Sequence, residues 1–159
     1  MNLPGGYETD TVVRIETNLD DLSPEISGAV MEKLFEAGAL DVWFTPVHMK
    51  KNRPGVMLSA LGQEESSARL IDIILTETSA FGVRVETIAR VKLERRFETV
   101  GTDSGEITIK LGLKGGEVVQ AAPEFESCRQ ASARTGKPLR AVYDEALSAW
   151  RSAAGVRIS

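Results

Sequence analysis

Hydrophobic residues alternate with polar ones, or recur with a helical period, in six successive segments of the first part of the chain. Alternation and β-branched or aromatic runs predict four strands, at residues 12–17, 40–47, 56–61 and 83–93. Apolar residues three and four positions apart predict helices at residues 24–37 and 64–77. The order β-α-β-β-α-β indicates a ferredoxin-like split βαβ unit, an antiparallel sheet with two helices on one face.

The remaining residues show a different pattern. Two turn signals, at residues 102–105 and 114–116, separate three strand-like runs, and Pro123 and Pro138 each open a helical stripe. The second unit is therefore predicted to be a small β-meander followed by a two-helix hairpin, which makes the fold class α+β. The expected limits are a short disordered lead-in at 1–10, the ferredoxin-like domain at 11–94, the meander and helical hairpin at 95–153, and a tail at 154–159.

The composition narrows the class of protein and its compartment. With 42% hydrophobic and 26% charged residues, the 159-residue chain has the balance of a soluble globular protein. No apolar run has the length of a membrane span, and the start lacks the pattern of a secretory signal. The single cysteine, Cys128, excludes an internal disulfide and favours a reducing, cytoplasmic compartment. It shares an apolar stripe with Phe125, so we expect it in the core.

The same counts limit metal and nucleic-acid chemistry. One histidine and one cysteine cannot build a Cys/His zinc site within a single chain. Any metal would be held by carboxylates, substrate phosphates and water, ligands that favour Mg²⁺ or Mn²⁺. The net charge of −4 argues against binding to nucleic acid, which needs a broad basic face.

A compact basic run stands out against this acidic background. Residues 48–55 contain the only histidine and three fixed positive charges, Lys50, Lys51 and Arg53, followed by the turn signal Pro54-Gly55. Such a cluster suggests capture of an anion such as phosphate. The simpler alternative is a solvated hairpin turn.

The order of the predicted elements brings two further loops to the same edge of the sheet as the basic run. The first strand leads into Asp20 and Asp21, and the second helix leads into Thr78, Ser79 and Arg84. The acids could instead stabilise the dipole of the first helix, and the hydroxyls could simply cap the second. Gly82, in the same segment, is expected at a turn that needs positive φ.

Acids, cations and hydroxyls on one edge have complementary chemistry. Carboxylates bind hard cations, and Lys, Arg and hydroxyl groups bind phosphate oxygens. The combination suits a metal–nucleoside triphosphate. The sequence has no P-loop, so a nucleotide would be held in another way.

Five motifs of the chain are distinctive in combination. The most specific is Met49-Lys50-Lys51-Asn52-Arg53-Pro54-Gly55. The others are Asn18-x-Asp20-Asp21, Gly38-Ala39-Leu40-Asp41-Val42-Trp43, Glu77-Thr78-Ser79-x-x-Gly82-Val83-Arg84 and Pro123-Glu124-Phe125-Glu126-x-Cys128. Together they resemble the C-terminal part of LarC, the nickel insertion protein family, over residues 11–152.

The resemblance implies a CTP-dependent cyclometallase, a lyase-type metal chelatase. Such a protein inserts nickel, the substrate metal, into pyridinium-3,5-bisthiocarboxylic acid mononucleotide and hydrolyses CTP in the presence of Mn²⁺ or Mg²⁺. The product is the nickel-pincer cofactor of lactate racemase. Family members carry a larger N-terminal region, often with His-rich segments. We therefore expect this chain to be the CTP-binding C-terminal domain, with that region and the mononucleotide as partners.

These expectations assign roles to particular residues. The nucleotide-binding set is Lys50, Lys51, Asn52, Arg53, Thr78, Ser79 and Arg84, the metal ligands are Asp20 and Asp21, and no catalytic residue is assigned. A homo-oligomer is expected. The alternative is a non-catalytic ferredoxin-like module that oligomerises or senses a small ligand. An RNA-binding module is opposed by the net charge, and by a first unit in which only Trp43 and Phe44 are strand aromatics suited to stacking on bases.

Overall fold

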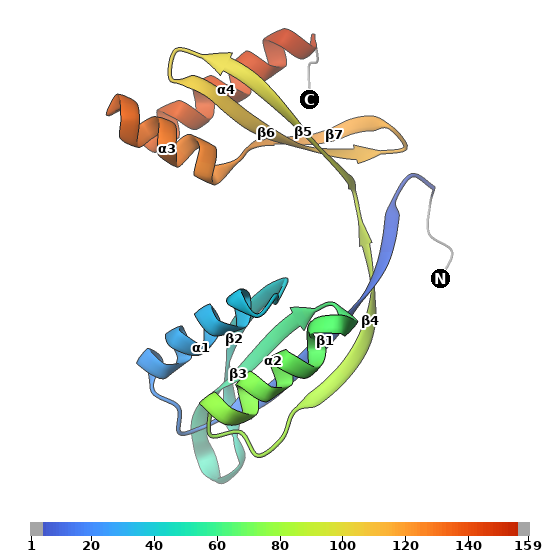
Figure 1. The fold of residues 1–159 in the computed structure, drawn as a ribbon, viewed down its shortest axis with the longest axis vertical. Coiled ribbons are helices and arrows are strands. Elements are labelled where there is room, and N and C mark those ends of the chain that lie inside the picture. The colour runs from blue at the N-terminus through green and yellow to red at the C-terminus, as the bar shows by residue number, and fades with distance from the viewer. Residues whose placement is uncertain (1–4, 156–159) are drawn as a thin grey trace. The chain divides into compact units, whose positions relative to one another are not determined.

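The computed structural model describes residues 5–155, which form two compact units (Figure 1). The first unit is Thr9–Arg90, and the second is residues 91–155 together with residues 5–8. The units divide a few residues before the limit expected from the sequence, because the long strand that leaves the first unit continues into the second.

The first unit is a four-stranded sheet with the order β2-β3-β1-β4. β1 and β2 both pair antiparallel to β3, and α1 and α2 cover one face of the sheet (Figure 1). The predicted ferredoxin-like α+β arrangement is confirmed. The elements are β1 (Glu8–Leu19), α1 (Pro24–Glu36), β2 (Asp41–Met49), a 3₁₀ turn (Lys50–Asn52), β3 (Arg53–Gly62), α2 (Glu64–Glu77) and β4 (Arg84–Lys92).

Alternation in β1 explains how the first unit forms its core. Val13, Ile15 and Leu19 are buried on the face toward the helices, where they pack with Leu58 of β3 and Leu34 of α1. Ser23 caps α1 as predicted, because its hydroxyl accepts a hydrogen bond from the backbone N–H of Ile26 (3.3 Å). Pro24 then opens the helix without sacrificing a backbone hydrogen bond.

The turn between β2 and β3 lies within the expected residues 48–55 but is shorter than expected. Pro54 and Gly55 are strand residues of β3, opposite His48 and Val47 of β2. The chain reverses instead at Lys50–Asn52. Proline is tolerated at this end of β3 because the pairing with β1 reaches only to Val56, so the missing N–H removes no bond on that side.

The ends of the chain differ in part from the expectation. β1 begins at Glu8, so residues 8–10 of the expected lead-in belong to a strand. α4 ends at Ala154, and most of the expected tail, residues 156–159, lies outside the described residues, as do residues 1–4.

The second unit is a three-stranded meander with the order β5-β6-β7 and two helices on one face (Figure 1). Its core lies between β6 and the helices, where Ile109 and Leu111 pack with Cys128, Val142 and Trp150. The elements are β5 (Glu94–Thr102), β6 (Gly105–Lys114), β7 (Glu117–Pro123), α3 (Phe125–Thr135) and α4 (Leu139–Ala154).

Cys128 is a core residue, as expected. It is completely buried, and burial raises the pKa of its thiol, which makes the thiolate form less accessible. Phe125, expected on the same stripe, is instead exposed at the start of α3. Within residues 5–155, no helix combines the length and the apolar character needed to cross a membrane.

Hydrogen bonds to Glu145 on α4 link the β5–β6 turn to the helices. The backbone N–H and hydroxyl of Ser104 donate to its two carboxylate oxygens (2.9 and 2.8 Å), and Lys137 Nζ donates at 2.9 Å. The hydrogen bonds from Lys137 and then Ser104 lower the pKa of Glu145 to about 2. Because this pKa lies below the ordinary 4.5, the carboxylate stabilises the fold above about pH 4.5, and that stability is lost as pH falls toward 2.

We predict that Glu145→Gln lowers the free energy of unfolding at pH 7, and that its difference from wild type shrinks as pH falls from 4.5 to 2. Urea unfolding followed by Trp150 fluorescence, in a Trp43→Phe background, measures this in the second unit. Asp144→Asn, at the exposed neighbouring position on α4, is the matched control. A difference that stays constant over that pH range would contradict the assignment.

Candidate functional site

Three loops of the first unit meet at one edge of the sheet, as the order of elements predicted. They are the loop after β1, the β2–β3 turn, and the segment between α2 and β4. Two side-chain hydrogen bonds join them: Arg53 Nη1 to Asp20 Oδ2 (2.9 Å) and Ser79 Oγ to Asp21 Oδ1. A third, from Arg84 Nη2 to Asn18 Oδ1 (2.8 Å), joins the adjacent ends of β4 and β1. We call these loops, with the strand ends beside them, the loop edge.

Gly55 allows the end of β1 to lie directly against the β2–β3 hairpin. A Cβ at this position would meet Leu19 O at 2.5 Å, Met49 Sδ at 2.9 Å and Asp20 Cα at 3.3 Å. Only glycine permits such an approach of one backbone to another. The contact places Asp20 within reach of Arg53, so the acidic loop and the basic turn form one surface.

The β2–β3 turn presents its lysines to solvent in an unusual backbone conformation. Lys51 and Asn52 have φ values of 62° and 58°. This left-handed region costs a residue with a side chain about 1–2 kcal/mol, although asparagine tolerates it better. His48 Nε2 and Asn52 Oδ1 form a hydrogen bond of 2.6 Å across the turn, which supports the conformation. The only histidine thus supports the turn through Asn52.

The two hydroxyl groups in the segment between α2 and β4, those of Thr78 and Ser79, have different roles. Thr78 Oγ1 donates to Ile74 O (2.6 Å) and accepts from Ala80 N (3.1 Å), so its hydroxyl caps the end of α2. Ser79 is exposed and faces Asp21 across the loop edge. Of the two predicted hydroxyls, Ser79 is the one that joins the loops.

Gly82 does not have the positive φ expected of it, since the glycines with positive φ lie elsewhere in the described part of the chain. Its carbonyl accepts a hydrogen bond from the buried hydroxyl of Thr17 (2.9 Å), which holds the segment against β1. Sequence reasoning gave no role to Thr17. It gave none to Asn18 either, the partner of Arg84, although Asn18 belongs to one of the five motifs. Their place at the end of β1 was the signal that could have identified both.

Electrostatically, the loop edge combines exposed cations with neighbouring acids. Lys50, Lys51 and Arg53 are all exposed, and the ion pair between Arg53 and Asp20 is open to solvent on the arginine side. The side chain of Arg84 also lies 3.8 Å from Glu16 Oε2. Exposed pairs of this kind contribute only about 0–1 kcal/mol, so a stronger ligand can replace either partner.

An apolar cleft of about 350 Å³ lies next to the loop edge. Leu22, which follows Asp21, and Val56, which follows Gly55, line it together with Met31 and Phe44. Apolar clefts with a few polar groups at the rim are the usual form of small-ligand sites.

The acids at the loop edge do not form a complete metal site by themselves. Within residues 5–155, no group of three or more His, Cys, Asp or Glu side chains is arranged to hold a metal ion. Asp20 and Asp21 could supply two of the oxygen ligands that a hard divalent cation needs, and a bound ligand and water would have to supply the rest.

Comparison with known proteins places the chain in a family. A family model described as "Nickel insertion protein" matches residues 2–143. The chain belongs to the nickel insertion protein family. The basic motif of the β2–β3 turn and the acids after β1 lie within the matched residues.

Relatives in this family carry a specific name. A pyridinium-3,5-bisthiocarboxylic acid mononucleotide nickel insertion protein from Acetivibrio thermocellus is 48% identical over 135 residues, 85% of this chain and 33% of the relative. The protein of that name from a Thermotoga species is 44% identical over 131 residues, 82% of this chain and 33% of the relative. The chain thus spans about a third of the length of these relatives.

Two solved structures share the fold. One is the apo form of the C-terminal domain of a cyclometallase involved in synthesis of the NPN cofactor of lactate racemase. It matches with a TM-score of 0.84 and 40% identity, over 89% of this chain and 98% of that one. The other, a protein of Methanopyrus kandleri, matches with a TM-score of 0.67 and 27% identity, over 92% of each chain. In the nickel insertion protein family, the present chain therefore corresponds to a C-terminal domain.

We predict that Gly55→Ala destabilises the first unit by about 1–3 kcal/mol, the usual cost of overpacking, because the added Cβ must displace Leu19 O. Urea unfolding followed by circular dichroism measures the change. Gly82→Ala is the matched control, since a Cβ at Gly82 has no neighbour within 4 Å. Equal effects of the two substitutions would show that the close approach at Gly55 does not constrain the loop edge.

Proposed function

We propose that the loop edge binds CTP together with Mn²⁺ or Mg²⁺, and that the chain is the nucleotide-binding C-terminal domain of a nickel insertase. The observation that carries the proposal is the hydrogen bond between Arg53 and Asp20. In this bond an arginine, a side chain that commonly binds phosphate, contacts an aspartate, a side chain that commonly binds metal ions. The two residues are far apart in the sequence.

The cations of the loop edge suit a triphosphate. Arg53 and Arg84 offer planar guanidinium groups, which can bind two phosphate oxygens at once, and Lys50 and Lys51 offer mobile ammonium groups. Asn52 fixes the shape of the turn from which the lysines project, and Ser79 adds a hydroxyl donor. Thr78 takes part through its backbone position at the end of α2, because its hydroxyl is used in capping.

The acids suit the divalent cation that accompanies a triphosphate. Mg²⁺ in proteins is usually held by one or two carboxylates plus phosphate oxygens and water. Asp20 uses Oδ2 and Asp21 uses Oδ1 in their hydrogen bonds, and we assign the other oxygen of each to the cation. When bound, the cation would neutralise phosphate charge, while Arg53 and Ser79 keep the two carboxylates oriented.

The apolar cleft beside the loop edge offers room for the base. Phe44 and Met31 give it the apolar and aromatic walls that a flat pyrimidine ring packs against, and Ser27 adds a polar group. The nucleotide would therefore lie with its base in the cleft and its phosphates across the β2–β3 turn.

The family suggests the reaction in which this domain takes part. The relatives are named for nickel insertion into pyridinium-3,5-bisthiocarboxylic acid mononucleotide. We propose that this chain serves the same reaction as part of a CTP-dependent cyclometallase of the lyase type, with nickel as the substrate metal. Because the chain spans about a third of these relatives, the preceding region of such a protein is the proposed partner for delivering nickel and the mononucleotide.

Calorimetric titration of the chain with CTP, with and without Mn²⁺, tests the site. We predict binding that Mn²⁺ strengthens. Arg53→Ala or Lys50→Ala should lower affinity at least about tenfold, as expected for a lost charge-assisted hydrogen bond. Asp20→Asn should remove most of the Mn²⁺ effect while keeping metal-free binding.

Arg69→Ala, at an exposed position on α2, is the matched control and should change nothing. Affinity that is unchanged in Arg53→Ala, or an absence of CTP binding, would contradict the proposal.

One observation favours self-association of the same domain. β4 is an edge strand, and its Val85, Thr87 and Ala89 are exposed, with Val85 at 50%. An unpaired edge with apolar side chains invites a second copy. We therefore propose a homo-oligomer that pairs through β4, which is compatible with nucleotide binding at the loop edge.

We predict that Val85→Lys combined with Thr87→Lys shifts the chain to a monomer in light scattering after size-exclusion chromatography. Charges on a strand edge oppose pairing between copies. Val119→Lys, at an exposed valine of β7, is the control. Retention of the oligomer in the β4 variant would rule out this interface, and self-association without CTP binding would favour a non-catalytic module.

A further inference from the structure

The apolar cleft beside the loop edge has one polar side chain, that of Ser27 on α1, among the lining residues in the described part of the chain. The other lining residues are apolar or, at Gly28, have no side chain. A side-chain hydrogen bond to a base in this cleft therefore depends on Ser27. The state of its hydroxyl decides which bases the cleft can distinguish.

The proton of the Ser27 hydroxyl is already used inside α1. Ser27 Oγ donates to the backbone carbonyl of Ser23 at 3.0 Å, and the same carbonyl accepts the backbone N–H of Ser27 at 3.0 Å. Serine in a helix commonly donates to the carbonyl four residues earlier in this way. A hydroxyl has one proton and two lone pairs, so Ser27 can still accept a hydrogen bond from a ligand but has no free proton to donate.

An acceptor without a free proton distinguishes the two common pyrimidines. Cytosine carries an amino group at C4, which donates, whereas uracil carries a carbonyl oxygen there, which accepts. C4 lies across the ring from N1, the atom that is bonded to the ribose. With the ribose and phosphates toward the loop edge, the C4 group points into the cleft. Ser27 lies there, one helical turn beyond the N-cap residue Ser23.

Gly28 leaves open the space next to Ser27. A Cβ at this position would have no neighbour within 4 Å outside its own helix backbone, so packing within the fold does not require a glycine. Glycine in the interior of a helix also lowers stability relative to alanine. The residue is therefore unfavourable for α1 itself, but it gives a flat ring room to reach Ser27.

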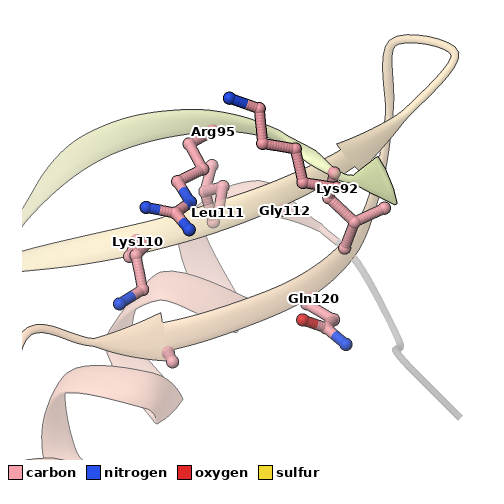
Figure 2. A pocket seen from close by; sticks show the side chains of 8 residues that line it. Lys92, Arg95, Lys110, Leu111, Gly112 and Gln120 are labelled. Atoms are coloured by element: carbon pink, nitrogen blue, oxygen red, sulfur yellow. The ribbon is translucent and has the colours of Figure 1, made fainter. Parts of the chain in front are cut away.

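A glycine of the second unit shows the opposite case. Gly112 lies in a hollow on the β5–β6–β7 sheet that is also lined by Arg95 and Lys110 (Figure 2). A Cβ at Gly112 would meet Leu93 Cδ1 at 2.7 Å, so this glycine makes room for a side chain of the protein itself. Among the described residues, the space next to Gly28 has no such occupant and is free for a ligand.

We propose that Ser27 and Gly28 make the apolar cleft selective for cytosine over uracil. Ser27 Oγ accepts a hydrogen bond from the amino group at C4 while it still donates to Ser23 O, and Gly28 admits the edge of the ring. Uracil in the same place brings its carbonyl oxygen against the lone pairs of Ser27, or makes the hydroxyl give up its bond within α1. This role of Ser27 rests on the proposed function, in which the base occupies the cleft.

Calorimetric titration with CTP and with UTP, each in the presence of Mn²⁺, tests the selectivity. The wild-type chain should bind CTP about threefold to tenfold more tightly than UTP, as expected for one hydrogen bond. Ser27→Ala should lower the affinity for CTP by this factor and leave that for UTP no weaker, so that the two affinities become nearly equal.

Ser67→Ala is the matched control for Ser27→Ala. Ser67 Oγ also donates to a backbone carbonyl near the start of a helix, that of Glu64 at 2.7 Å, but Ser67 does not line the cleft. Its substitution should leave both affinities, and the ratio between them, unchanged.

Gly28→Ala gives a second readout in which stability and binding change in opposite directions. The substitution should raise the midpoint of urea unfolding, because alanine suits a helix better than glycine. It should also lower the affinity for CTP at least about threefold, because the methyl group occupies space that the ring needs. A lower midpoint, or an unchanged affinity for CTP, would overturn the role of Gly28.

The outcomes separate base selectivity from nucleotide binding itself. Equal affinity of the wild-type chain for CTP and UTP, or a preference for CTP that survives in Ser27→Ala, overturns base recognition by Ser27 and leaves the proposed function intact. Arg53→Ala should weaken CTP and UTP binding equally, because both carry the same triphosphate. An absence of binding by both nucleotides contradicts the proposed function, and the role of Ser27 with it.

Discussion

The antiparallel pairing of β1 with β3 runs through the centre of the four-stranded sheet, from Val13–Gly62 to Leu19–Val56. This register determines which face of β1 is buried, since a slip of one residue would turn Ile15 outward. It also fixes where β1 stops. The strand ends against Gly55, so the next two residues, both acids, must lie beside the basic β2–β3 turn.

Charged side chains of the loop edge form weak ion pairs with one another. The arginine and the aspartate of the Arg53–Asp20 pair have exposed side-chain fractions of 58% and 24%. Pairs at this level of exposure stabilise the fold little but keep both groups oriented. A metal–triphosphate offers each partner a stronger counterpart, the cation for the acid and phosphate for the arginine. These pairs thus hold the side chains close to the arrangement that the proposed ligand needs.

Most of the fold could be predicted from local sequence patterns. Alternation in β1, the Ser23 cap and the helical stripes depend on neighbours in sequence, and their predictions were confirmed. The β2–β3 turn is shorter than the expected residues 48–55. Pro54-Gly55 is a strong turn signal but continues β3, and the reversal itself needs a left-handed Lys51.

The candidate site was only partly predictable, because local patterns do not encode contacts between distant segments. Topology placed Asp20, Asp21, Arg53, Ser79 and Arg84 at one edge, and the hydrogen bonds confirm that they meet. The role of the Thr78 hydroxyl in capping and the partnership of Asn18 with Arg84 depend on three-dimensional contacts. No pattern within one segment encodes those contacts. Whether these residues bind CTP stays a prediction, and one structure can test it.

A crystal structure of the chain grown with CTP and Mn²⁺, with anomalous scattering recorded at the manganese edge, tests the central claim most directly. The account predicts a manganese peak coordinated by Asp20 or Asp21 and by CTP phosphate oxygens, with Arg53 bound to the same triphosphate. A triphosphate bound away from the three loops, or a manganese ion with neither aspartate among its ligands, would contradict it.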